Sequence, residues 1–192
     1  MRRQDSMAAI WARAIVYLGI IAGGWLGVLP AIALTLEYKR PRVRLRSAPW
    51  VAFGTLCGVM AAPLGLVAGF HLITRGRGTP LPLDPPRALV TSGPYRVVRN
   101  PQAIAMLLAV AGEVAAIRSR FLWLMLPLTV IYLELLVGPW EDRQLTATFG
   151  EAYLAYKRRV HKWLPSCPRE NRAWFARISS GRASRRHAGS GK

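Results

Sequence analysis

The chain has 192 residues, 52% of them hydrophobic, and a formal net charge of +18 at pH 7. This length suits one domain or one small helical bundle. The charged residues are separated from long apolar runs, which is the pattern of a membrane protein and not of a water-soluble domain. Two cysteines, Cys57 in an apolar run and Cys167 in a basic tail, cannot form a disulfide framework. With no CxxC or HxxxH spacing either, we expect no metal site.

The first apolar run covers residues 14–36 and holds 23 residues without a charge. It exceeds the roughly 20 residues that cross about 30 Å of hydrocarbon. It is also too long for the apolar region of an ordinary signal peptide, and further apolar runs follow it. We therefore predict a membrane span here. The alternative is that this run is re-entrant.

The second apolar run, residues 49–73, is also long enough to cross the membrane. Two more runs, 102–117 and 121–139, are separated by only three residues, which forces an antiparallel helical hairpin. The 16 residues of the third run reach only about 24 Å. This helix must either thin the bilayer locally or lean on the surrounding protein.

The distribution of basic residues predicts the orientation. With four spans, both termini and the loop 74–101 share one side, which carries twenty of the 27 Lys and Arg residues, and the other side carries seven. The positive-inside rule then places the termini and this loop in the cytoplasm, in a multi-pass protein of the inner membrane. Five basic residues lie in the segment 37–48. If the first run were re-entrant, that segment would also be cytoplasmic.

The segment 166–192 is rich in Arg, Ser and Gly, and is too polar to pack a core. We predict a membrane domain over residues 1–165 followed by a disordered basic tail. Attraction to anionic lipid headgroups accounts for the charge of the tail. We expect membrane lipids as partners and neither nucleic acid nor a protein partner, because Trp174 and Phe175 are the only aromatic residues interleaved with this charge.

A polar motif, TSGPYRVVRNPQ (residues 91–102), lies directly before the third apolar run. Its Gly-Pro pair signals a turn, Asn100 is a natural N-cap, and Pro101 suits the first helical position. The exposed N–H groups of such a helix start, with Arg96 and Arg99 beside them, make an anion-binding arrangement. The alternative is an interfacial anchor, since Tyr and Arg routinely flank membrane spans.

The other end of the hairpin carries Glu141 and Asp142. After them, apolar and aromatic residues recur at helical spacing, namely Leu145, Phe149, Tyr153, Tyr156 and Val160. This spacing predicts an amphipathic helix along the membrane surface. Because a hairpin brings its two ends together, we expect Arg99 and Asn100 to lie near the two carboxylates, under an aromatic roof. A zwitterionic, cationic ligand with an aromatic base would suit such a site.

The two segments GPYRVVRNP and ED..L...FG..Y..Y...V..WLP resemble the membrane methyltransferases related to isoprenylcysteine carboxyl methyltransferase and phospholipid methyltransferases. Bacterial members of this family show G-P-Y-x-x-x-R-[NH]-P-x-Y and E-E-x-x-L-x-x-x-F-G-x-x-Y-x-x-Y-x-x-x-V-P-x-x-[IL]-P. The stretch GRGTPLPLDPPRALV is also similar to bacterial members. The resemblance covers residues 76–165. It implies S-adenosylmethionine as methyl donor at the cytoplasmic end of the hairpin, and a lipid or lipidated acceptor that enters from the bilayer.

The resemblance assigns roles residue by residue. The matching residues are Tyr95, Arg99, Asn100 and Pro101 in the first motif, and Glu141, Phe149, Tyr153, Tyr156 and Pro165 in the second. It implies that Arg99 and Glu141 are catalytic and also bind the donor. A carboxylate can hold the donor's ammonium or ribose hydroxyls, and an arginine can bind a carboxylate through two hydrogen bonds. The tyrosines suit a sulfonium cation.

Four positions depart from the family pattern: Ala103 replaces tyrosine, Ala105 glycine, Asp142 glutamate and His161 proline. The missing tyrosine favours an alternative, a catalytically silent scaffold of the same fold with a lipid-binding tail. A sterol-reductase-type enzyme that uses a nicotinamide cofactor is a third hypothesis, which the absence of GxGxxG disfavours.

Two acids, Glu113 and Glu134, lie within predicted spans, where a carboxylate is costly and is a functional candidate by default. Glu134 and Glu141 are seven residues apart, about 700° of helical rotation, and would share one helix face. We predict that Glu113 and Glu134 belong to the acceptor pocket. The alternative for Glu134 is a protonated acid bonded to a neighbouring helix. These elements together predict an all-α integral membrane protein with about four transmembrane helices and a C-terminal amphipathic interfacial helix.

Overall fold

The computed structural model describes residues 6–39, 43–79 and 86–166. Within these ranges every regular element is helical, apart from an isolated bridge between Leu45 and Ile117. The predicted all-α membrane fold is confirmed. The predictions for the basic tail fall on residues 167–192, outside the described part of the chain.

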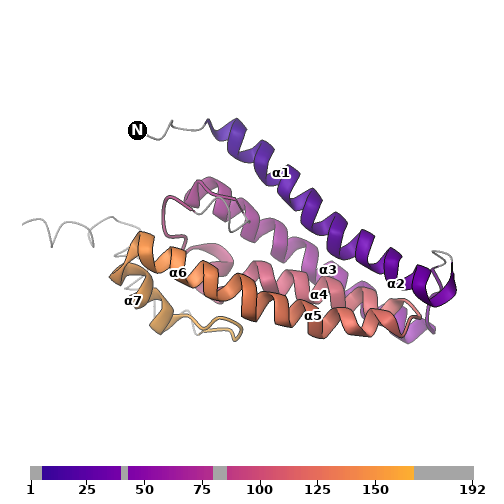
Figure 1. Cartoon of the computed structure of the whole chain (residues 1–192). Coiled ribbons are helices and arrows are strands. Elements are labelled where there is room, and N and C mark those ends of the chain that lie inside the picture. Colours follow the sequence, from indigo (N-terminus) through magenta and orange to yellow (C-terminus); the bar gives the residue numbers. More distant parts are fainter. Residues whose placement is uncertain (1–5, 40–42, 80–85, 167–192) are drawn as a thin grey trace, which may run out of the picture.

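In the described part of the chain the helices form four rods and a short final helix (Figure 1), with one 3-10 turn, η3 (Gly93–Arg96), between the second and third rods. The first rod joins α1 (Met7–Gly23), the π-helical turn η1 (Gly24–Val28) and α2 (Leu29–Tyr38). The second joins α3 (Ala48–His71) and η2 (Leu72–Gly76), and the third is α4 (Pro101–Ala116). The fourth joins η4 (Phe121–Leu124), α5 (Met125–Ile131), η5 (Tyr132–Val137) and α6 (Gly138–Phe149), and α7 (Glu151–Arg159) follows.

Among the described residues, three rods are long and apolar enough to cross a membrane: Met7–Tyr38, Ala48–Gly76 and Phe121–Phe149. They contain the predicted spans 14–36, 49–73 and 121–139. The predicted span 102–117 corresponds to α4, which is apolar but shorter. Helix α4 packs along α3 (Figure 1), so this short helix leans on its neighbour in the bundle.

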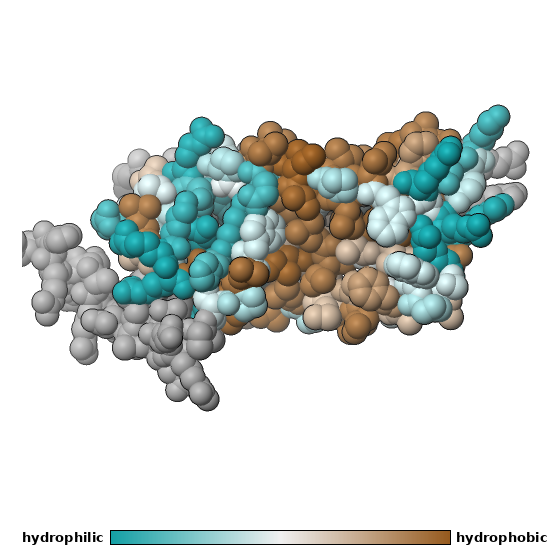
Figure 2. Space-filling view, turned by 90° about the horizontal axis from the view of Figure 1, so that it is seen from below, coloured by the Kyte–Doolittle hydropathy of each residue, from teal (hydrophilic) through white to brown (hydrophobic). Residues whose placement is uncertain are grey.

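The rods run alternately up and down, so the start of α1, the end of α3, the start of α4 and the α6–α7 corner lie at one end of the bundle (Figure 1). On the face shown in Figure 2, an apolar belt lies between two hydrophilic ends. This arrangement fits a bundle whose long axis crosses the hydrocarbon layer.

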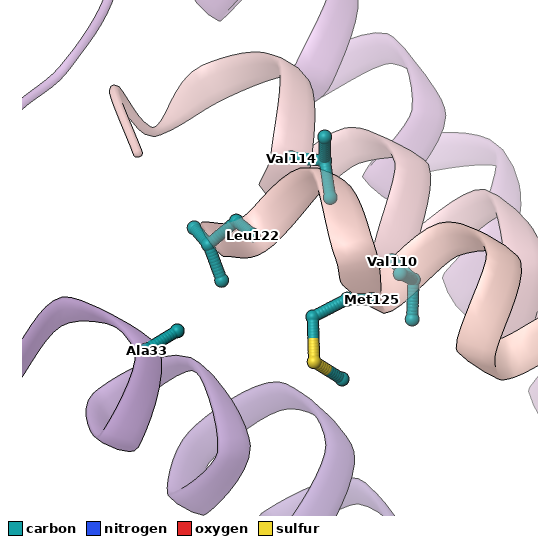
Figure 3. Close-up of a cluster of buried hydrophobic side chains, with 5 residues drawn as sticks. All are labelled: Ala33, Val110, Val114, Leu122 and Met125. Carbon is teal, nitrogen blue, oxygen red and sulfur yellow. The ribbon is translucent and has the colours of Figure 1, made fainter. Parts of the chain in front are cut away.

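The end of the bundle opposite α7 is closed by an apolar cluster (Figure 3). Ala33 of α2, Val110 and Val114 of α4, Leu122 of η4 and Met125 of α5 point toward one another there. Leu122 is fully buried. The turn between α4 and η4 is also held by polar contacts, because Glu37 Oε2 accepts from Ser119 Oγ at 2.6 Å and from the Arg120 amide at 3.0 Å. This end therefore fixes the hairpin whose other end carries the two motifs.

Helix α3 and helix α4 approach each other through glycines. A Cβ on Gly54 would lie 2.5 Å from the Gly112 carbonyl oxygen, and a Cβ on Gly112 would lie 2.7 Å from the Gly54 carbonyl oxygen. Small residues allow such close backbone approach between membrane helices. The two helices therefore pack closely against each other near the end of the pair that lies away from the motif loop.

The amphipathic helix predicted over residues 145–160 is divided in two. Gly150 separates α6 from α7. Its φ is +52°, a backbone conformation that residues other than glycine rarely adopt. The predicted apolar face still packs as one cluster, because Leu145 and Phe149 of α6 contact Tyr153, Tyr156 and Val160. The prediction of one continuous helix was therefore wrong, although its residues do come together.

Candidate functional site

The motif loop, residues 91–100, is seated on the end of α3. Gly93 has φ +61°, and a Cβ there would collide with the imidazole ring of His71. The Nδ1 atom of the same imidazole lies 3.0 Å from Ser92 Oγ. The glycine is thus needed both for its backbone conformation and for the close approach of the His71 ring.

The loop ends in the predicted helix cap. Asn100 Oδ1 accepts a hydrogen bond from the Ala103 amide at 3.2 Å, and Pro101 is the first residue of α4. Both helix-start predictions are confirmed. The first turn of α4 is therefore stabilised by residues next to it in the sequence, the Asn100 cap and Pro101.

A C-terminal strap, residues 161–166, lies against the motif loop. The Arg99 amide donates to the His161 carbonyl at 2.8 Å and the Asn100 amide donates to the Lys162 carbonyl at 3.3 Å. The Ser166 amide donates to the Val97 carbonyl at 2.7 Å. These bonds bring two segments some sixty residues apart in sequence into one site.

Helix α7 closes over the site through its tyrosines. The Tyr153 hydroxyl donates to Asp142 Oδ1, and the Tyr156 hydroxyl donates to the Tyr95 carbonyl at 2.7 Å. Lys157 Nζ lies 2.5 Å from the second oxygen of Asp142. Asp142 thus ties α7 to α6, and Tyr156 ties α7 to the motif loop.

The buried phenols are neutral. Burial raises the pKa of Tyr95 well above its usual value, and the nearby Glu141 charge adds to the rise. Burial also raises the pKa of Tyr153 and of Tyr156. All three lie outside the spanning segments and remain hydrogen-bond donors at any physiological pH.

Opposite charges face each other across this end of the bundle. The Arg99 guanidinium carbon lies 5.9 Å from the centre of the Tyr153 ring, and its Nη1 is buried without a hydrogen-bond partner among the described residues. The half-buried Glu141 carboxylate interacts electrostatically with Arg99. Within the part of the chain that the structure describes, the two side chains form no ion pair with each other. Both charges are therefore available to a ligand.

A cavity of about 1210 Å³ begins at these charges. Its polar end is lined by Tyr95, Arg99, Asn100, Glu141, Tyr153 and Tyr156. Its walls continue between the first rod, α3 and α4 with apolar residues that include Leu18, Trp25, Phe70, Ala105 and Met106. Every predicted donor-site residue except the buried Pro101 lines this one cavity.

Of the two acids predicted for the acceptor pocket, Glu113 lines the cavity and Glu134 does not. Glu113 lies 13 residues or about 20 Å along α4 from Asn100. The carboxylate of Glu134 instead accepts hydrogen bonds from Lys162 Nζ at 2.9 Å and from Trp163 Nε1. The rotation of 700° assumed a regular α-helix. Glu134 instead lies in the π-helical turn η5, whose wider turns change the angular spacing to Glu141.

The alanines that replace family residues are small side chains at the cavity wall. Ala103 and Ala105 are 4% and 6% exposed and both line the cavity. A Cβ on Gly65 of α3 would lie 3.3 Å from the Ala105 Cβ. A small side chain at position 105 therefore permits the close packing of α3 on α4.

His161 and Asp142 each have local partners that suit the residue present. The His161 amide donates to Ser166 Oγ at 2.9 Å, a hydrogen bond that a proline could not make. Asp142 points to α7 rather than into the cavity, as its bonds to Tyr153 and Lys157 show. Neither departure removes a group that faces the cavity.

Three polar residues of the site were missed from the sequence. Lys162 lies in a strap without helical periodicity, so nothing in its spacing marked it. Gln144 lines the cavity one helical turn after Glu141, a spacing that could have revealed it. Thr79 also lines the cavity, is only 2% exposed, and its hydroxyl has no hydrogen-bond partner in the described ranges.

The fold and the site together define a class: an all-α membrane protein with opposite charges and neutral phenols at the polar end of an otherwise apolar cavity. The family model described as phospholipid methyltransferase matches residues 78–152, less than half of the chain. This stretch contains the motif loop, α4, the fourth rod and the start of α7. The match confirms the resemblance drawn from the two motifs and supports a membrane methyltransferase. Neither a curated protein nor a solved structure matches the chain.

Proposed function

We propose that this chain is an integral-membrane methyltransferase that uses S-adenosylmethionine to methylate a lipid or lipidated acceptor. The observation that carries the proposal is the single cavity that joins a charged end to apolar walls. Its volume of about 1210 Å³ exceeds the roughly 1,000 Å³ at the upper end for a pocket that holds one small ligand. A polar donor and an apolar chain can therefore occupy it together.

The residues present fit the donor. Arg99 has a buried nitrogen without a hydrogen-bond partner among the described residues, and buried polar groups are normally paired. A ligand carboxylate would satisfy this guanidinium, and Glu141 would hold the ammonium group of the same amino-acid moiety. Tyr95, Tyr153, Tyr156 and the cap residues Asn100 and Pro101 complete the pocket around it. Aromatic faces accommodate a neighbouring cation.

The chemistry requires alignment more than proton transfer. When bound, S-adenosylmethionine supplies an electrophilic methyl group on a positively charged sulfur. Transfer cancels that charge, so orientation and exclusion of water provide most of the rate enhancement. Arg99 and Glu141 fix the orientation of the bound donor, and the tyrosines of α7 exclude water from the polar end of the cavity.

The acceptor reaches the site along the apolar walls. The acceptor's hydrocarbon chain would lie in the part of the cavity between the first rod, α3 and α4. Apolar residues of the predicted membrane spans line this part. Glu113 lies on this route and can bind a polar group of the acceptor. We place the charged end in the cytoplasm, at the inner membrane, because most basic residues share that side.

Calorimetric titration of the purified protein with S-adenosylmethionine tests the proposal. Each charge-assisted hydrogen bond contributes roughly 1.5–3 kcal/mol, so Arg99→Ala and Glu141→Gln should each weaken binding about ten- to a hundredfold. Arg158→Ala is the matched control, because that side chain is 67% exposed on α7 and does not line the cavity. If wild-type protein, folded in detergent, shows no binding at millimolar donor, the proposal fails and the scaffold alternative stands.

A further inference from the structure

We propose that Glu134 is a positioning residue that anchors the C-terminal strap and thereby holds Arg99 and Asn100 in place for the donor. The inference rests on the proposed function. It assigns Glu134 a role different from the acceptor contact expected from the sequence.

Two side chains of the strap converge on this one carboxylate. Lys162 Nζ lies 2.9 Å from Glu134 Oε2, and Trp163 Nε1 donates to Glu134 Oε1. Glu134 is 13 residues from Phe121, the start of its rod, or about 20 Å along a helix that must cross roughly 30 Å of hydrocarbon. A carboxylate at this depth requires a partner. Lys162 and Trp163 of the strap are the partners of this carboxylate, and Glu134 in turn fixes the position of the strap.

The same strap residues also hold the donor site. The carbonyls of His161 and Lys162 accept the amides of Arg99 and Asn100. The Lys162 ammonium also interacts electrostatically with Glu141. A single lysine therefore connects Glu134 to both sides of the charged end of the cavity.

The backbone of the fourth rod is shaped to admit the lysine. A Cβ on Gly138 would lie 2.5 Å from Lys162 Nζ, so the side chain crosses the rod where no Cβ is present. Lys162 Nζ also lies 5.3 Å from the centre of the Trp163 ring. The glycine is a second observation, independent of the ion pair, that this lysine has a fixed path to Glu134.

Hydrogen exchange in donor-free protein and donor titration together test the inference. Glu134→Gln removes the charge but keeps an acceptor for Trp163, and Lys162→Met removes the ammonium. In either variant, exchange of the Arg99 and Asn100 amides, followed by mass spectrometry, should quicken about threefold or more, and donor affinity should fall by a similar factor. Exchange within α3 should stay unchanged, which shows that the fold is retained.

The controls separate positioning from a general loss of charge. Lys162→Arg keeps a positive charge at this position, so the exchange of the Arg99 and Asn100 amides and the donor affinity should both stay close to the wild-type values. Glu151→Gln breaks another acid–base pair, with Arg158 at 3.8 Å, in which both side chains are exposed, and it should change neither readout. Unchanged exchange in both Glu134→Gln and Lys162→Met would overturn the inference, as would faster exchange with unaltered donor affinity. Wild-type protein that binds no donor would overturn the proposed function and with it this role.

Discussion

Three buried tyrosines line the polar end of the cavity, beside Arg99 and Glu141. Tyr95, Tyr153 and Tyr156 are 9% exposed or less. The Tyr153 hydroxyl donates a hydrogen bond to a carboxylate, and the Tyr156 hydroxyl donates one to a backbone carbonyl. Because burial raises the pKa of each phenol, all three stay neutral, and Tyr153 and Tyr156 act as hydrogen-bond donors and not as acids or bases.

Alkaline titration followed by tyrosine absorbance checks this assignment. Of the six tyrosines, these three should remain protonated in the folded protein above pH 10. In the unfolded chain they ionise near a pKa of about 10. Above that pH the unfolded state binds fewer protons, so the free energy of unfolding falls as pH rises, and below it the phenols add no pH dependence. Ionisation of all six tyrosines near pH 10, with the helices intact, would show that these three phenols are not held neutral by burial.

Residue types and spacing predicted part of the site. Asn100 and Pro101 were predictable because helix starts depend on local chemistry. The proximity of Arg99 to Glu141 followed from the hairpin, since a connection of three residues leaves no other arrangement. The partners of Glu134 and Asp142 were not predictable, because they lie on the strap and on α7, whose approach depends on the turn at Gly150.

Helices α3 and α4, which pack along each other, are the two helices that carry the motif loop, since the loop contacts His71 at the end of α3 and leads into α4. Gly54 and Gly112 place the two backbones against each other. Added methyl groups in such a contact force the helices apart, and overpacking typically costs about 1–3 kcal/mol.

Gly54→Ala should therefore lower the midpoint of thermal unfolding in detergent by several degrees, since 1 kcal/mol shifts it by about 2–4 °C for a chain of this size. Gly58→Ala is the matched control on the same helix, because a Cβ there meets no atom within 4 Å. The midpoint of thermal unfolding of Gly58→Ala should stay the same or rise, because alanine has a higher helix propensity than glycine. Equal losses in the two variants would contradict a close α3–α4 contact.

The helices themselves were predictable from uninterrupted apolar length, which is why the predicted spans fall within the observed rods or match α4. The π-helical turns η1, η2 and η5 were not, since a change of hydrogen-bond pattern leaves no mark in apolar composition. The division at Gly150 had a sequence signal in the glycine itself, although the helical spacing on both sides concealed it.

For the whole molecule, the alternating rods place both ends of the described chain on one side of the bundle (Figure 1). The first rod is continuous over Met7–Tyr38 and 32 residues long, about 48 Å at 1.5 Å per residue. This length favours a complete crossing over a re-entrant segment.

Reporter fusions test the orientation. A reporter placed after residue 192 should be active only in the cytoplasm, and one inserted near Arg44 should be active only outside, because twenty of the 27 basic residues share the side of the termini. A cytoplasmic signal near Arg44 would contradict this orientation.

We propose that one cavity brings a methyl donor and an apolar acceptor together. The decisive assay measures transfer of a labelled methyl group from S-adenosylmethionine into the lipid extract of membranes that carry the protein. We predict label in that extract with the wild-type chain and at most about a tenth as much with Arg99→Ala, at donor concentrations below saturation. If wild type and Arg99→Ala both gave only background labelling, although the wild type binds the donor, the protein would be a silent scaffold and not a methyltransferase.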